Sequence, residues 1–185
     1  ESAYVTELYD RVSDVAKGAA LMTGTRVSCR TVSAYAELLS VPSMEALMME
    51  AMQEAEKPEY TDDDYEYAAR FAADQASPSI DTAILPADQT INLGSTDVGD
   101  VSWQVPTGLI GVTTEAAGCA LHTWQIVAQG KSPLAHKGMH YAARILFAAA
   151  KKLYESPERC ALIQDDYQNV IGHRTYQSML PDSVK

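Results

Sequence analysis

The chain opens with a pattern of apolar and polar positions that predicts an amphipathic helix. Between residues 5 and 22 apolar side chains recur at steps of three and four, and charged side chains fill the opposite face. Gly24 is predicted to end this helix. Residues 25–34 then alternate as a β-strand does. One helix and one strand cannot bury both faces of the strand, so we expect the apolar face of the helix to be exposed unless a partner covers it.

Further along, three helix starts can be recognised from the residues that precede them. The periodicity lapses around residues 35–42, where we place a domain boundary, and Ser43 can cap a helix whose methionines have core spacing. Thr61 opens a second helix, because three aspartates follow it where the helix dipole favours negative charge. Ser132 and Pro133 are typical of an N-cap and first turn, and open a long helix.

Two segments between these helices add to the predicted fold. Gly94-Ser95-Thr96-Asp97 is a polar turn before a short helical segment, which Pro106 ends, and residues 107–113 form a β-like apolar run. The resulting order of strand, helix, strand and helix predicts an α/β layer.

Composition and charge narrow the class of protein. The chain has 185 residues, of which 46% are hydrophobic and 21% charged, as in globular proteins. Its net charge of -11 disfavours nucleic acid as a partner. The longest apolar run, residues 145–150, is far too short to span a bilayer. The three cysteines are widely spaced, which favours a reducing cytoplasm over a disulfide framework.

Histidines are the clearest candidates for metal chemistry. His136 and His140 lie four residues apart, as two ligands on one helix face do, but Lys137 lies between them and no glutamate base accompanies them. His122 follows an apolar run and a loop of small residues, where an α/β sheet presents its site residues. It is either a metal ligand or a hydrogen-bonded structural histidine. Likewise, the turn at Gly94 either binds a carboxylate through backbone N–H groups or only caps a helix.

Taken together, these motifs resemble a known family. The turn at residues 94–97, then Pro106, the run 107–113 and Leu121-His122 are similar to the C-terminal signature of M20 metallopeptidases and amidohydrolases. Three longer strings more narrowly resemble the aminobenzoyl-glutamate hydrolases of that family: GSTDVGDVSW at 94–103, LHTWQ at 121–125 and AHKGM at 135–139.

The resemblance implies a fold and a division of the chain. Residues 1–36 would be the last helix and strand of a lid or dimerisation domain. Residues 37–185 would be the C-terminal part of a catalytic α/β domain, an open sheet with helices. The family forms dimers, so a related protein chain, identical or not, is an expected partner.

The resemblance also implies a chemistry. Family members use two divalent ions, zinc or manganese, and His122 is the residue here that matches a metal ligand. The other ligands and the general base would lie upstream, so no catalytic residue is assigned in this chain and it is expected to be inactive alone. Gly94, Ser95 and Thr96 would line the substrate side. The implied reaction is hydrolysis of N-acyl-amino-acid amides, and more narrowly of p-aminobenzoyl-glutamate to p-aminobenzoate and glutamate.

Two alternatives remain open from the sequence. The first is a hydrolase of other N-acyl amino acids, such as hormone conjugates or hippurate-like compounds. The second is a non-catalytic, acidic α/β interaction module in which His122 is merely structural.

Overall fold

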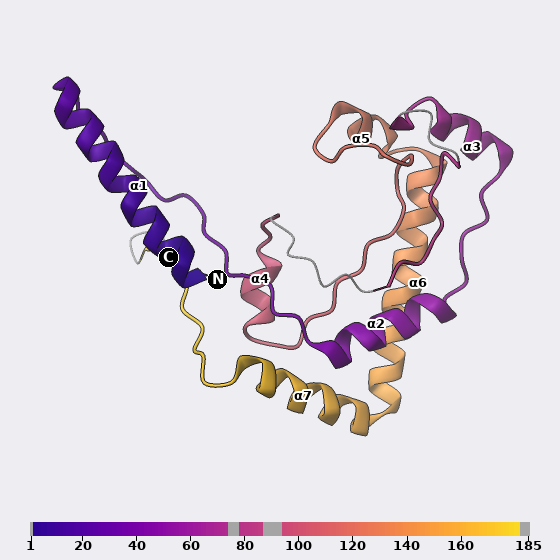
Figure 1. Ribbon diagram of the computed structural model, residues 1–185. Helices are drawn as coiled ribbons and strands as arrows, with labels where there is room; N and C mark the ends of the chain where they lie inside the picture. The colour runs from indigo at the N-terminus through magenta and orange to yellow at the C-terminus, as the bar shows by residue number, and fades with distance from the viewer. Residues whose placement is uncertain (1, 74–77, 87–93, 182–185) are drawn as a thin grey trace. The chain divides into compact units, whose positions relative to one another are not determined.

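The computed structural model describes residues 2–73, 78–86 and 94–181 (Figure 1). The regular structure in these ranges is helical. The helices are α1 (Ser2–Thr23), α2 (Pro42–Glu54), α3 (Asp62–Ala69), α4 (Val98–Ser102), α5 (Trp124–Gln129), α6 (Pro133–Glu155) and α7 (Pro157–Ile171).

The chain divides into two compact units. One comprises residues 1–41, 91–107 and 164–185, and the other comprises residues 42–90 and 108–163. Each unit is therefore discontinuous in sequence. The domain boundary expected between residues 36 and 37 stays a prediction.

In the first unit, α1 forms as its periodicity predicts. It ends at Gly24, whose φ of 67° is the left-handed conformation that glycine adopts at low cost. No residue of α1 is buried, and Val12, Val15 and Leu21 are all more than 60% exposed. The expectation that this helix exposes its apolar face is confirmed.

A second part of the first unit is built around α4. The hydroxyl of Ser102, 1% exposed, accepts a hydrogen bond from the backbone N–H of Leu39 at 2.9 Å. Asp100 accepts two more, from the backbone of Ala36 at 3.3 Å and from the hydroxyl of Tyr176 at 2.9 Å. Three segments that are distant in sequence are thereby joined at one short helix.

In the second unit, α2 packs against α6 (Figure 1). The apolar side chains that α2 buries are Leu47, Met48 and Ala51, so the prediction that this helix presents an apolar core face is confirmed. At the edge of this packing, the carboxylate of Glu50 accepts hydrogen bonds from Lys152 and Arg159, with nitrogen–oxygen distances of 2.7 and 2.5 Å. These contacts tie the start of α7 to α2 and α6.

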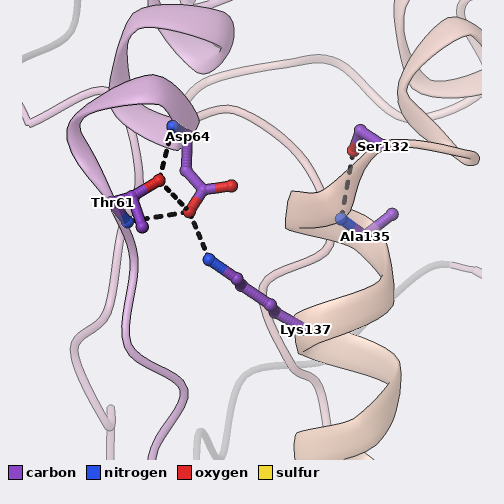
Figure 2. A network of polar contacts seen from close by, with 5 residues as sticks. All are labelled: Thr61, Asp64, Ser132, Ala135 and Lys137. Carbon is purple, nitrogen blue, oxygen red and sulfur yellow. Dashed lines mark hydrogen bonds and ion pairs between the residues drawn. The ribbon is translucent and has the colours of Figure 1, made fainter.

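Helix α3 contacts the first turns of α6, and both helix starts were predicted correctly. Thr61 and Asp64 form a reciprocal capping box, and the hydroxyl of Ser132 accepts from the backbone N–H of Ala135 at 3.1 Å. Lys137 on α6 also forms an ion pair with Asp64 (Figure 2). Beside this contact lies a small core of four buried side chains: Ala68, Ile80, Ala116 and Leu134.

The predicted α/β open sheet is wrong for the described part of the chain. Residues 25–34 and 107–113, both expected as strands, belong to no sheet there, because the ranges that the structure describes contain no β-strand. Alternation reports a local preference only. A strand also needs a neighbour that pairs with its backbone N–H and C=O groups, and in the described ranges neither segment has one. Among the helices described, none combines the length and apolar character needed to cross a membrane.

Candidate functional site

His122 lies in a turn immediately before α5, in the second unit. The expectation that it follows a strand of an α/β sheet and a loop is wrong in its first part, since no strand precedes it in the described chain. Its side chain is exposed and its backbone has a φ of 62°. A residue other than glycine at positive φ costs on the order of 1 to 2 kcal/mol. His122 is the one residue in the described ranges that carries this cost, and such conformations cluster at functional sites.

The loop that leads to His122 is held by backbone hydrogen bonds to Ala73 and Ser79, which precede it in the same chain. The N–H of Ala117 donates to the carbonyl of Ser79 at 2.8 Å, and the carbonyl of Ala117 accepts from Ala73 at 3.2 Å. Gly118 follows with a φ of 74°, and a Cβ there would lie 3.0 Å from the Cβ of Ala73. Glycine is therefore favoured here, because it adopts this φ at low cost and a Cβ would crowd Ala73. The loop has no regular secondary structure, but hydrogen bonds and close packing hold its backbone in place.

A buried side chain supports the loop from α5. Gln129 is fully buried, and its Oε1 accepts from the backbone N–H of Ala116 at 2.8 Å. Its Nε2 donates to the carbonyl of Gln125 at 3.0 Å and to the sulfur of Cys119 at 3.5 Å. The Cys119 thiol in turn donates to the carbonyl of Phe71 at 3.2 Å. Sequence reasoning missed both residues, because no motif distinguishes a glutamine near a helix end.

Aromatic and polar groups adjoin His122 in sequence. The ring of Trp124 is 70% exposed and meets Phe71 edge-on, with 6.3 Å between the ring centroids. The Oε1 atom of Gln125 is buried and has no hydrogen-bond partner in the described part of the chain. Leaving a buried acceptor without a hydrogen bond typically lowers the stability of the fold by about 1 to 3 kcal/mol. A strained histidine and an unsatisfied acceptor three residues apart are two unfavourable local features that a purely structural loop would not need.

The predicted substrate residues Gly94, Ser95 and Thr96 belong to the first unit, where they are exposed and precede Asp97, the N-cap of α4. The hydroxyl of Thr96 accepts from the N–H of Val98 at 3.3 Å, and its carbonyl accepts from Gly99 at 3.1 Å. Thr96 thus holds the start of α4. These residues and His122 belong to different units.

His136 and His140 lie on one helix, as their spacing predicts. His136 and His140 are exposed on successive turns of α6, and His173 is exposed after α7. In the described ranges, no three His, Cys, Asp or Glu residues lie close enough together to hold a metal ion. The chemistry of the donor at His122 nevertheless fits one, because an exposed imidazole is a good ligand for zinc and supplies one of its usual four positions.

A cavity of about 590 Å³ lies on the side of residues 116–119 that faces α2. Methionines 48, 49 and 52 line it together with Glu45, Asp81 and Glu115, and no lysine or arginine of the described chain does. Carboxylates without cations repel an anionic ligand. Any carboxylate substrate bound nearby would need positive charge from another source.

The chain as a whole is similar to one component of a hydrolase. It is 30% identical, over an alignment of 213 residues that includes all of this chain, to the B subunit of p-aminobenzoyl-glutamate hydrolase from Escherichia coli (strain K12). The chain spans 44% of the length of that protein. This similarity confirms the resemblance to the aminobenzoyl-glutamate hydrolases that the three sequence strings indicate. No family model matches the chain, and no solved structure matches it.

Proposed function

We propose that this chain is part of a metal-dependent amidohydrolase that cleaves p-aminobenzoyl-glutamate into p-aminobenzoate and glutamate. The observation that supports the proposal is the 30% identity along the whole chain to one component of p-aminobenzoyl-glutamate hydrolase. Because the name of that relative designates one subunit of the hydrolase, we include in the proposal an assembly with a related partner chain. We also include a cytoplasmic location, which the cysteine spacing favours.

In this proposal His122 holds one of two divalent ions, zinc or manganese, through an imidazole nitrogen. The exposed ring and the fixed loop behind it support that role. When bound, such ions polarise an amide carbonyl and lower the pKa of an attacking water. In the same proposal, the remaining ligands and the general base come from outside the described residues. No described residue is therefore assigned a catalytic role.

The substrate's charge gives the metals a second role. Glutamate is anionic, the chain carries a net charge of -11, and the cavity beside the His122 loop is lined by carboxylates. Divalent ions would supply the missing positive charge. Gly94, Ser95 and Thr96 are proposed to line the substrate side, with backbone N–H groups near an anionic group of the substrate.

The test is hydrolysis by the natural gene product that carries this sequence, purified with its partner chain. We expect release of p-aminobenzoate from p-aminobenzoyl-glutamate at a rate on the order of 1 per second or more. A chelator should abolish it, and zinc or manganese should restore it. Preference for hippurate or another N-acyl amino acid would replace the proposed substrate, and absence of any metal-dependent amide hydrolysis would favour a non-catalytic module.

A further inference from the structure

Gln129 differs from the other buried polar side chains in what it connects. The exposed fraction of its side chain is zero, and its amide group makes hydrogen bonds in three directions. Two partners, Ala116 and Cys119, precede His122 in the chain, and the third, Gln125, follows it. The Gln129 amide therefore holds the chain on both sides of His122.

This arrangement constrains the turn that contains His122. Only Ala120 and Leu121 separate Cys119 from His122, and Thr123 shortens the free segment further because its hydroxyl donates to the carbonyl of Ala120 at 2.8 Å. With both ends held, the chain has few ways to connect them. The left-handed backbone of His122, at a φ of 62°, is the conformation that makes this connection.

The chemistry of the position indicates that hydrogen bonding, and not volume, is what Gln129 supplies. Burying an amide without partners typically costs about 1 to 3 kcal/mol, and methionine would fill a similar volume without that requirement. A buried polar side chain is therefore useful at this position only if the fold needs the hydrogen bonds that it makes.

We propose that Gln129 is a positioning residue for His122, which fixes the imidazole where it binds metal. The inference rests on the proposed function, because it takes His122 to be a metal ligand. Groups that orient a metal ligand from behind typically contribute about 10 to 100-fold to metal affinity or activity.

The experiment compares four variants of the natural gene product: Gln129→Met, Gln129→Glu, His122→Ala and Ile145→Val. Gln129→Met keeps the volume but removes all three hydrogen bonds. Gln129→Glu keeps the acceptor for Ala116 and removes both donors. Ile145→Val shortens a fully buried side chain on α6 and serves as the control for a general loss of stability. The readouts are zinc affinity, by competition with a chelator, and the visible absorption of the cobalt-substituted protein, which reports ligand geometry.

We expect Gln129→Met to weaken zinc binding about 10 to 100-fold and to shift the cobalt spectrum. Ile145→Val should change neither the zinc affinity nor the cobalt spectrum, even if it lowers the melting temperature as much as Gln129→Met does. If Gln129→Met does not fold, Gln129→Glu decides, with an expected loss of about tenfold. If His122→Ala binds zinc as the wild type does, the proposed function fails. If His122→Ala loses zinc while the Gln129 variants retain wild-type affinity and spectrum, the positioning role alone is overturned.

Discussion

The ammonium group of Lys137 on α6 forms an ion pair with the carboxylate of Asp64 on α3, whose side chain is only 5% exposed. The same carboxylate accepts from the backbone N–H and the hydroxyl of Thr61, at 2.8 and 2.9 Å (Figure 2). Burial raises the pKa of Asp64, but the hydrogen bonds from Lys137 and Thr61 outweigh it, so the pKa lies below its ordinary value of 3.8.

Asp64→Asn should therefore destabilise the second unit. It removes the charge that Lys137 pairs with and weakens the capping box, so we expect a loss of about 1 to 3 kcal/mol in the free energy of unfolding. Asp63→Asn is the matched control, because Asp63 is the exposed neighbour in the same helical turn and should change stability by less than about 0.5 kcal/mol. Urea unfolding followed by circular dichroism measures both. Equal effects of the two substitutions would show that the ion pair contributes nothing.

A second prediction concerns acid stability through Glu50. Its hydrogen bonds with Arg159, and then with Lys152, lower the pKa of Glu50 from 4.5 to about 2. A carboxyl group whose pKa is lower in the folded chain stabilises the fold above its unfolded pKa, and this contribution is lost as the pH falls through the folded value. Wild-type stability should thus fall between about pH 4.5 and pH 2.

Glu50→Gln should flatten that dependence, because glutamine does not titrate. Melting temperatures measured between about pH 2 and pH 5 check this window. Glu155→Gln provides the control, since Glu155 is 65% exposed and its nitrogen–oxygen distance to Lys151 is 3.8 Å. A Glu50→Gln profile parallel to that of the wild type would contradict the assignment.

A third prediction contrasts two helical glycines. A Cβ at Gly138 on α6 would lie 2.1 Å from the carbonyl oxygen of Thr113, whereas a Cβ at Gly18 on α1 would meet nothing within 4 Å. Gly138→Ala should therefore cost about 1 to 3 kcal/mol through overpacking. Gly18→Ala should stabilise α1 by up to about 1 kcal/mol, because alanine favours the helix. Thermal unfolding followed by circular dichroism tests the pair, and a gain from both would mean that Thr113 does not approach Gly138 closely.

The elements that the sequence predicts well are those with local signals. Thr61, Ser132 and Gly24 sit at helix ends, where one side chain or one backbone conformation satisfies nearby groups, so their roles follow from their neighbours. Residues 25–34 and 107–113 failed as strands, because a strand depends on a partner elsewhere in the chain.

For the site, the sequence could single out His122 but not what holds it. The string at residues 121–125 singles out the histidine through its resemblance to the family, and the metal-binding role of His122 stays a prediction. Gln129 and Cys119 contribute only through contacts of the folded chain, with Ala116 and with Phe71. No spacing rule foresees such contacts. The left-handed φ of His122 likewise could not be predicted, because positive φ is uncommon for any residue other than glycine, even for histidine, which adopts it more often than most.

The most direct test of the account is the metal content of the natural gene product with His122→Ala, measured by elemental analysis beside His136→Ala and His140→Ala. We predict that His122→Ala loses about one metal ion per chain and falls at least about 10 to 100-fold in p-aminobenzoyl-glutamate hydrolysis. The two α6 variants should keep their metal and their rate. A His122→Ala protein with unchanged metal content and activity would contradict the metal-binding role of His122.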